Sequence, residues 1–465
     1  MASSFGGINT ALTSLYAQRR GLDVTGENIA NANTEGYSRQ RVRMSSITTN
    51  ANPGIYSGAT QAGAGVQVTG VERSRNEYMD ARSRVEHSNS AYLTSQKAAY
   101  DQIESVLAEP SDTALQARLH DMWDSWNDVA NNWQDPSTRS TLIERSHTVA
   151  ATLNDTYGSL SNQFDANRST TGAYVDQVNT LAKSIAEMNQ KIVVATSSGV
   201  AANELRDTRD NQVMRLSELV GATAQPKENG AVNVYIGNAT LVSDFTTRKV
   251  VLDGPASLDG ITPSDQVSLK WTDTGDRAAA GGTMGAMLDT MNSVLPGIST
   301  RLDAVAAGLT KKINDAVQSG FDINGNPGIQ FFDGDTAKTI KVVIDDPAMV
   351  GFSRGNPLTE EKLDNGIADG LVDDAAAGRV PDQDYQAMIG QLGVAAQAAG
   401  RRSEIQDSVT DQVDTARDAE SGVNLDEEMT HLLTYQRGYE AASRVLTTID
   451  SMLDQLINRT GLVGR

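Results

Sequence analysis

The sequence predicts a mainly α, elongated, multi-domain protein in which helices from the two ends of the chain pair as a coiled coil. At both ends, apolar residues repeat every seven positions, and most of the interior shows helical periodicity. One internal stretch, residues 222–278, instead alternates apolar and polar residues as β-strands do. The expected architecture is therefore a terminal coiled coil, a rod of long helices and a small inserted β domain.

Composition argues against several classes of function. The 465-residue chain has no cysteine, so disulfides, thiol nucleophiles and thiolate-bound metals are excluded. Its formal net charge of −20 argues against nucleic-acid binding, because a polyanion would be repelled and no basic patch compensates. No apolar run is long enough to cross a bilayer, and the first residues lack the layout of a cleaved signal. We therefore expect no membrane insertion.

The C-terminal stretch carries the clearest heptad pattern. Its first seam takes Leu425, Leu432, Tyr439, Leu446 and Leu453, and its second takes Tyr435, Ala442, Ile449 and Leu456. At the other end, Ile8, Leu15, Leu22 and Ile29 repeat every seven residues, with Leu12 beside them. Because an apolar stripe needs a covering surface, we expect the two helices to pair with each other. Packing of each helix on a globular core would explain the pattern equally well.

The N-terminal helix is expected over residues 7–33. An asparagine-rich run ends it, because asparagine side chains compete for the backbone and tolerate left-handed geometry. An extended segment follows at 41–44. After a loop rich in glycine and alanine, a second extended segment is expected near 66–71.

Residues 28–40 resemble the N-terminal signature of bacterial flagellar axial proteins, the family of rod, hook and hook-associated proteins. The ending Gly-Tyr-Ser-Arg-Gln, residues 36–40, is most similar to the hook-associated protein 1 branch. The run 435–442, Tyr-Gln-Arg-Gly-Tyr-Glu-Ala-Ala, resembles the C-terminal signature of the same family. The signature residues that we assign to the assembly interface, together with the heptad positions, are Asn31, Asn33, Gly36, Tyr37, Arg39, Tyr435, Gln436, Arg437 and Tyr439.

Long helices are expected through the first half of the interior. The second of them, with Leu115, Leu119, Met122, Trp126 and Val129 on one stripe, would begin at a cap formed by Ser111 or Asp112. Trp123 beside that stripe could belong to a ligand box, but helical spacing favours ordinary core packing. Ser137 is expected to cap a further long helix that continues with breaks to Ile192. A shorter amphipathic helix is expected over 203–220.

The second half is predicted to begin with four to six short strands in 222–278. Helix then returns from Thr283 to Ile313, and a hairpin turn explains Asp322–Gly328 better than a calcium loop, because Pro327 stands where a calcium loop needs glycine. A strand is expected at Ile340–Ile344, a loop from Gly355 to Asp384, and a helix over 386–421. The expected domains are residues 1–86 with 422–465, 87–221 with 283–421, and 222–282.

No motif points to catalysis. The four histidines, His87, His120, His147 and His431, have no metal-ligand spacing, and neither a nucleophile elbow nor a phosphate-binding loop occurs. We expect no enzyme activity, no metal site and no cofactor.

The family resemblance implies a structural role in the bacterial flagellum. It implies export through the flagellar type III apparatus, a place outside the cell in the junction layer between hook and filament, and terminal helices that fold on assembly. The implied partners are further copies of the chain in a ring or helical layer, the hook protein, the second junction protein, and a cytoplasmic export chaperone covering the C-terminal helix. Another axial protein is the nearest alternative. A coiled-coil adaptor would explain the heptads but not both signatures, and a hydrolase would need a catalytic constellation in the β insertion.

Overall fold

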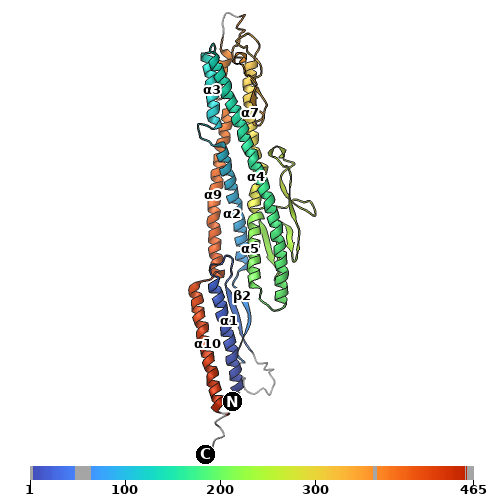
Figure 1. The fold of residues 1–465 in the computed structure, drawn as a ribbon, viewed down its shortest axis with the longest axis vertical. Helices are drawn as coiled ribbons and strands as arrows, with labels where there is room; N and C mark the ends of the chain where they lie inside the picture. Colours follow the sequence, from blue (N-terminus) through green and yellow to red (C-terminus); the bar gives the residue numbers. More distant parts are fainter. Residues whose placement is uncertain (1–3, 48–63, 360–363, 456, 458–465) are drawn as a thin grey trace, which may run out of the picture.

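The computed structural model describes residues 4–47, 64–359, 364–455 and 457. The molecule is elongated, with the terminal helices at one end and a rod of long helices extending from them (Figure 1). The helices are α1 (Ser4–Ala30), α2 (Glu77–Leu107), α3 (Leu115–Asn131), α4 (Pro136–Ser197), α5 (Asn203–Val220), α6 (Gly282–Asp289), α7 (Leu295–Gln318), α8 (Gly366–Ala376), α9 (Asp382–Ser421) and α10 (Leu425–Asp454). A π-helical turn, Thr290–Val294, joins α6 to α7. The predicted fold class is confirmed.

The strands form small antiparallel sheets. They are β1 (Gln40–Ser46), β2 (Val66–Arg73), β3 (Ala222–Pro226), β4 (Val232–Ile236), β5 (Ala239–Ser243), β6 (Thr246–Thr247), β7 (Val250–Asp253), β8 (Ser268–Trp271), β9 (Phe332–Asp333) and β10 (Lys341–Val342). β1 pairs with β2, β7 with β8 and β9 with β10, and the remaining sheet has the order β3-β4-β5-β6. Residues 222–278 thus hold six strands, within the predicted range. The strand expected at Ile340–Ile344 is shorter, Lys341–Val342.

α4 is the longest of the described helices. Its 62 residues run without interruption, so the breaks expected within it are wrong. Its N-cap is Asp135, whose carboxylate accepts the Ser137 backbone N–H at 2.8 Å, so Ser137 is not the cap. The expected Ser111 or Asp112 cap of α3 is also wrong. Ala114 occupies that position, and the Glu109 carboxylate accepts the Gln116 N–H instead.

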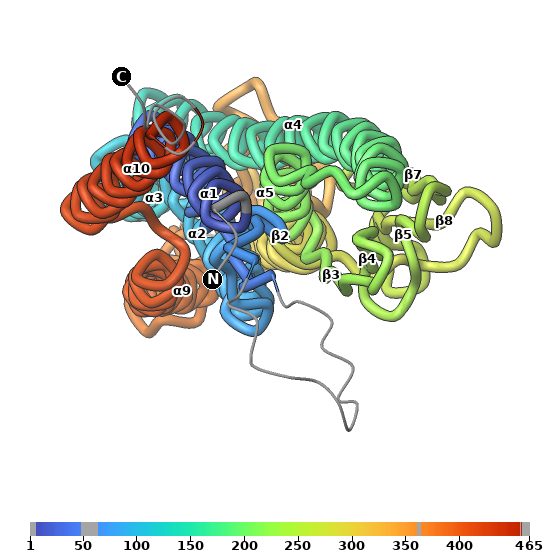
Figure 2. Tube along the Cα trace, turned by 90° about the horizontal axis from the view of Figure 1, so that it is seen from below, coloured from blue at the N-terminus to red at the C-terminus, as the bar shows by residue number. Residues whose placement is uncertain are grey.

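Two apolar clusters hold the rod together. The distal one joins α3, the first half of α4 and α7, and it completely buries Met122 and Trp126, so the aromatic stripe is core as predicted. The other joins the second half of α4 and α5 to the inserted strands, around residues such as Val234 and Trp271. The inserted strands are therefore packed on the rod helices rather than on a core of their own, and they lie on one side of α4 and α5 (Figure 2).

Asparagine side chains fasten the inserted strands to the helices. The Asn189 amide on α4 donates to the Val232 carbonyl at 2.8 Å and accepts the Val232 N–H at 3.0 Å. Asn179, ten residues earlier on the same helix, makes the same pair of bonds with Val250 at 2.9 and 3.0 Å. Each amide bonds both the N–H and the carbonyl of one strand residue, as a neighbouring strand would. These backbone groups are therefore satisfied where no strand pairs with them.

The segment from Gly355 to Asp384 is not a single loop as expected. Residues 366–376 form α8, which buries Ile367, Ala368 and Leu371, the last two within the distal cluster, and α9 already begins at Asp382. The segment has few apolar residues among many glycines and aspartates, so its apolar pattern did not predict this short helix. Residues 360–363 lie outside the described residues.

The turn at Asp322 is a hairpin turn closed by its own side chain. The buried Asp322 carboxylate accepts the N–H groups of Asn324 and Asn326, both at 2.8 Å. Its oxygens are occupied by the chain itself, as an Asx turn requires. In the described part of the chain, no group of three or more His, Asp and Glu side chains is arranged to hold a metal ion.

The expected domain division remains a prediction. α2 is continuous through residue 86, where the first boundary was expected. Among the described helices, none has the length and apolarity that crossing a bilayer requires.

Candidate assembly interface

The two terminal helices run antiparallel and in constant register. A Cβ built on Gly21 would lie 2.6 Å from the Tyr435 ring, and one built on Gly7 would lie 3.0 Å from Ile449. Moving fourteen residues along α1 thus moves fourteen residues back along α10. The two terminal helices therefore lie side by side, and of the two packing schemes left open by the heptads, they use the one in which they cover each other (Figure 1).

The predicted seam of α10 fits this arrangement in most positions. Ala442 is buried, and the part-buried members of the seam are Leu432, Tyr435, Leu446, Ile449 and Leu453. Two members differ from the prediction: Leu425 and Tyr439 are 49% and 40% exposed. Leu456 lies outside the described residues.

The predicted seam of α1 is displaced. Ile8, Leu15, Leu22 and Ile29 are only part-buried, and Leu12 is 39% exposed. The buried positions are instead Ala11, Ala17, Gly21, Val24, Thr25 and Asn28. Small side chains allow the two backbones to approach closely, which moves the larger residues to the edges of the contact. A search for large apolar residues cannot detect a seam lined by Gly and Ala.

The signature loop is organised around Asn28. Its Oδ1 accepts the Tyr37 hydroxyl and the Gln40 N–H, both at 2.9 Å. Its Nδ2 donates to the Gln40 carbonyl at 2.9 Å and to Glu428 Oε2 at 3.0 Å. All four bonding positions of this buried amide are used, so the loop has one defined course. Burial, followed by the charges of Glu27 and Asp207, raises the pKa of Tyr37, which keeps its hydroxyl a donor.

Arg39 connects this loop to the beginning of α10. Its Nε donates to Glu428 Oε1 at 2.7 Å and its Nη1 to Glu427 Oε2 at 2.9 Å. Glu428 is 2% exposed, and Arg39 has 15% of its side chain exposed. The Arg39 N–H also bonds the Ser421 carbonyl at the end of α9. Arg39 therefore holds the end of α9 and the beginning of α10 in place.

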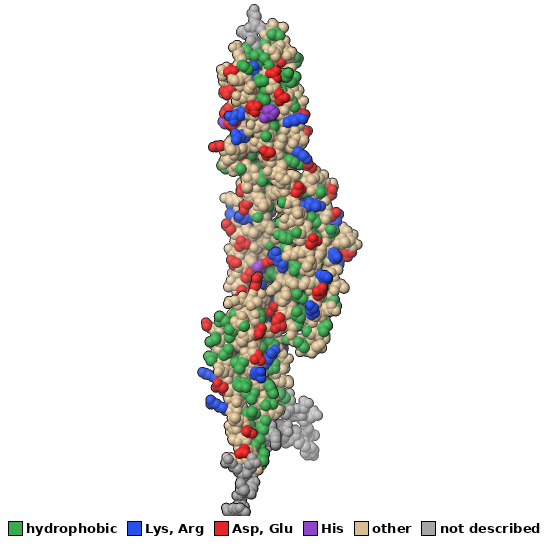
Figure 3. Space-filling view, in the orientation of Figure 1, with side chains coloured by type: hydrophobic (Ala, Val, Ile, Leu, Met, Phe, Trp, Pro, Cys, Tyr) green, Lys and Arg blue, Asp and Glu red, His purple; other side chains and the backbone are tan. Residues whose placement is uncertain are grey.

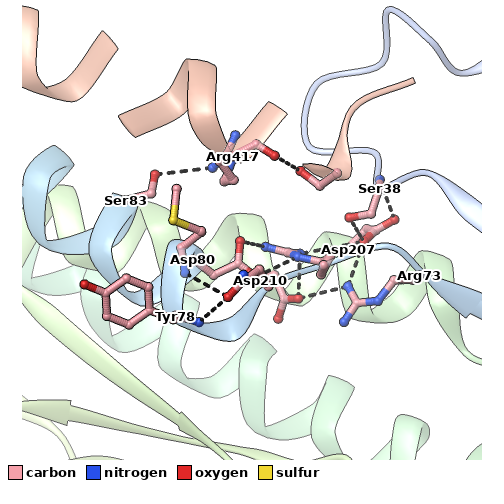
Figure 4. A network of polar contacts seen from close by, with 12 residues as sticks. Ser38, Arg73, Tyr78, Asp80, Ser83, Asp207, Asp210 and Arg417 are labelled. Atoms are coloured by element: carbon pink, nitrogen blue, oxygen red, sulfur yellow. Dashed lines mark hydrogen bonds and ion pairs between the residues drawn. The ribbon is translucent and has the colours of Figure 1, made fainter. Parts of the chain in front are cut away.

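The joint between the terminal pair and the rod is polar (Figure 4). Asp207 on α5 accepts bonds from the Ser38 hydroxyl at 2.8 Å and from Arg73 at 2.7 Å. Asp210 accepts from Arg73 at 2.9 Å and from Arg75 at 2.8 Å. The pKa of Asp210 lies below its usual value. Burial by itself raises this pKa, but the guanidinium groups of Arg209, Arg75 and Arg73 lower it further than burial raises it. Neither apolar cluster of the rod includes a residue of the terminal pair.

The other predicted interface residues have smaller roles within the monomer. Asn31 bonds Glu27 one turn earlier, while Asn33, Gln436 and Arg437 are exposed. Gly36 has φ +74° beside Asn211, where a Cβ would overlap the side chain, so glycine is required there. Pattern analysis missed Glu428, Asp207 and Asp210, since no local pattern marks a carboxylate whose partners lie elsewhere in the sequence.

An apolar face of the terminal pair is left uncovered. The exposed apolar residues of the two helices are Leu12, Tyr16, Leu425, Met429, Leu433, Tyr439, Val445 and Met452. Figure 3 shows apolar side chains gathered over this end of the molecule. Exposed apolar side chains that gather on a protein surface are typical of surfaces that associate with other proteins.

Known proteins give a consistent picture. A family model described as "Flagellar hook-associated protein FlgK helical domain" matches residues 100–332. "Flagella basal body rod protein" matches residues 8–37, and "Flagellar basal body rod FlgEFG protein C-terminal" matches residues 418–459. The two terminal matches coincide with α1 and α10, and the middle match coincides with most of the rod and the inserted strands.

Individual relatives agree with these models. The chain is 30% identical to flagellar hook-associated protein 1 of Bacillus subtilis, with 100% of both chains covered. It is 24% identical to the protein of the same name from Escherichia coli, with 97% of this chain and 99% of that protein covered. The solved flagellar hook junction protein FlgK from Burkholderia pseudomallei is 23% identical, with a TM-score of 0.48 over 54% of this chain and 46% of the other.

Proposed function

This chain belongs to the flagellar hook-associated protein 1 family, and on that premise we propose that it forms the junction layer between hook and filament. It is a structural component of the bacterial flagellum that acts outside the cell. The observation that carries the mechanism is the uncovered apolar face of the antiparallel α1–α10 pair. Neighbouring subunits cover that face when the protein joins the flagellar axis.

Assembly completes the folding of the terminal pair. Of the 30 residues of α10, the described side chains that are buried are those of Glu428 and Ala442. A helix pair with so little closed core is marginal in water, because ordering the chain costs about 1–2 kcal/mol per residue and little burial offsets it. Burial against neighbours adds the missing apolar contact, so the pair becomes firmly ordered only at the growing end. This discourages polymerisation inside the cell.

The partners follow from the same surface. Further copies of the chain, the hook protein on one side and the second junction protein on the other contact the terminal pair. A cytoplasmic export chaperone covers α10 before export. The exposed side chains of Met429, Leu433, Val445 and Met452 give such a chaperone apolar contacts along α10. The protein has no catalytic role, in keeping with a family of structural flagellar proteins.

Rod and hook proteins share the terminal features, so these features by themselves do not separate the candidates. The match over residues 100–332 is to a helical domain of the hook-associated protein and supports the junction role over other axial roles.

Two substitutions on the uncovered face test this function. Leu433→Asp and Val445→Asp each place a charge where a neighbour should pack, at side chains that are 50% exposed in the monomer. We expect both variants to be exported and to keep the thermal unfolding midpoint of the rod, yet to lose filaments and release filament protein into the medium.

The matched control is Val394→Asp on α9, whose side chain is 68% exposed on the rod. It introduces the same charge far from the terminal pair and should build normal flagella. Normal filaments with both Leu433→Asp and Val445→Asp would show that this face is not the assembly surface.

A further inference from the structure

A pocket lies where the β1–β2 hairpin, the rod and the inserted strands meet. Its volume is about 580 Å³, and its walls come from β2, the first turns of α2, the end of α4, α5 and the strands β3 and β4. One wall is the polar joint of Figure 4. We call it the arginine pocket, after the arginines that line it: Arg73, Arg75, Arg84, Arg206 and Arg209.

The pocket is far less acidic than the molecule as a whole. The whole chain carries −20, yet the walls bring five arginines together with four carboxylates, those of Glu72, Glu77, Asp80 and Asp210. The two buried or part-buried carboxylates are already engaged. Asp80 holds Arg75 with bonds of 2.7 and 2.8 Å, and Asp210 is shared by Arg73, Arg75 and Arg209.

Two arginines are left without a carboxylate. Arg84 on α2 makes no hydrogen bond or ion pair within the described residues, and its side chain is part-buried in the wall of the pocket. Arg206 on α5 donates from Nη2 to the Thr196 hydroxyl at 3.2 Å, and its buried Nε has no acceptor among the described residues. Burial lowers the pKa of both side chains.

The remaining carboxylates, Glu72 and Glu77, make no hydrogen bond or ion pair with these two arginines, although the charge of Glu77 acts on Arg84. Glu72 is exposed and pairs with Arg43 at 2.7 Å, and Glu77 is exposed at the first turn of α2. The Arg206 Nε is buried without an acceptor, which is costly because this N–H has lost its hydration and gained no partner. Arg84 and Arg206 therefore present donors that an incoming acceptor would satisfy.

The beginning of α5 adds to this arrangement. Its N-cap position is Ala202, which offers no side-chain acceptor, and the flanking residues Ala201 and Asn203 line the pocket. The first N–H groups of a helix carry partial positive charge and favour an anion. Two guanidinium groups and a helix N-terminus thus open into one cavity.

We propose that the arginine pocket is a binding site for an oxyanion, held by Arg84 and Arg206. Carboxylate and phosphate have the planar or tetrahedral oxygens that a guanidinium binds through paired N–H donors. The oxyanion comes either from a carboxylate side chain of a neighbouring subunit or from free phosphate, and both have the chemistry that the pocket requires.

Thermal unfolding of the full chain in inorganic phosphate tests the site. Phosphate should raise the unfolding midpoint above its value in sodium chloride of equal ionic strength, and the rise should saturate. Arg84→Gln and Arg206→Gln should each weaken phosphate binding about ten-fold, as expected for the loss of a charged hydrogen-bonding partner. Without phosphate, Arg84→Gln should unfold at the same temperature as the wild type or higher, because it removes an unpaired charge.

Arg401→Gln, at an exposed arginine of α9, is the matched control and should respond to phosphate as the wild type does. An equal response of the wild type to phosphate and chloride would overturn the proposal, and so would an unchanged phosphate response in both pocket variants. In cells, loss of the hook–filament junction in the double variant would identify a neighbour's carboxylate as the oxyanion. A normal junction, with the phosphate effect lost in vitro, would identify free phosphate.

Discussion

At the scale of single residues, a few buried polar groups determine how the ends of the chain meet. Asn28 and Arg39 converge on Glu428, which lies about 400 residues away in sequence and is 2% exposed. The sequence allowed Tyr37 and Arg39 to be predicted as interface residues because they belong to a recognisable signature. Glu428 could not be predicted, since nothing in its local sequence separates it from the neighbouring acidic residues.

Removal of Glu428 should loosen the terminal pair. Glu428→Ala removes a buried acceptor from the part-buried Arg39 and the buried Asn28, a type of loss that costs about 3 kcal/mol. Glu427→Ala, at an exposed partner of the same arginine, should cost at most about 0.5 kcal/mol. Hydrogen exchange of the α1 and α10 amides measures both free energies of opening. Equal effects of the two substitutions would mean that burial of Glu428 contributes nothing.

His87 gives the rod a pH-dependent contact. Its Nε2 lies 2.7 Å from Asp414 on α9 and its Nδ1 3.5 Å from Glu218 on α5. Arg215 also pairs with Glu218, and the Ser83 hydroxyl also bonds Asp414. The hydrogen bond with Glu218 and the charge of Asp414 raise the pKa of His87 against the opposing effect of burial.

Because the folded pKa of His87 lies above the unfolded value of about 6.5, its stabilisation is fully present below that pH. The stabilisation is lost as the pH rises through the raised pKa. His87→Gln should therefore lower the free energy of unfolding by about 1 kcal/mol at pH 6 and by much less at pH 9. Denaturant titrations at the two pH values test this. His120→Gln, at a side chain 78% exposed, should show little change at either pH.

At the scale of the elements, the terminal pair is built on close approach rather than on large apolar side chains. The Tyr435 ring packs closely against Gly21, and the Gln18 side chain packs closely against Gly438. The heptads of α10 predicted most of its seam because Leu and Ile dominate that seam. On α1 the contact uses Gly and Ala, which carry too little hydrophobicity for a pattern to reveal.

Two glycines of α1 should respond in opposite directions to the same substitution. Gly21→Ala should destabilise the terminal pair by about 1 to 2 kcal/mol, because its methyl group would overlap the Tyr435 ring. At Gly26 nothing lies within 4 Å, so Gly26→Ala should stabilise α1 by up to about 1 kcal/mol through helix propensity alone. Hydrogen exchange of α1 amides measures both. Stabilisation by Gly21→Ala would contradict the close packing of the two helices.

The rod and the insertion show a similar division between what sequence could and could not predict. Strict periodicity around Trp126 predicted a buried stripe, and alternation in 222–278 predicted short strands. The continuity of α4 could not be predicted, because its apolar stripe changes partner from the distal cluster to the inserted strands along its length. The placement of those strands depends on single amides such as Asn179 and Asn189, which no periodicity marks.

At the scale of the whole molecule, the terminal pair is attached through a polar joint to a rod that has an apolar core. The Asp207 carboxylate accepts hydrogen bonds from the Ser38 hydroxyl and the Arg73 guanidinium across that joint. An interface of ion pairs and hydrogen bonds is more easily rearranged than a packed apolar core, so the angle between terminal pair and rod depends on few contacts.

Loss of Asp207 should widen the range of angles between the terminal pair and the rod. Because the chain has no cysteine, Ala441→Cys on α10 and Lys183→Cys on α4 allow two spin labels to be placed at exposed positions. The distance distribution between them should broaden in Asp207→Ala. Asp244→Ala, which removes an exposed ion pair with Lys227 in the inserted strands, should leave the distribution unchanged. An unbroadened distribution in Asp207→Ala would mean that the joint does not rely on this carboxylate.

The most direct test of the junction role is immunogold labelling of intact flagella with antibodies against residues 222–278. These residues form the inserted strands on the side of the rod, away from the terminal pair (Figure 1). The proposed function predicts a single cluster of gold where hook meets filament. Label spread along the hook or the filament, or no label on flagella although the epitope is accessible on the purified protein, would contradict it.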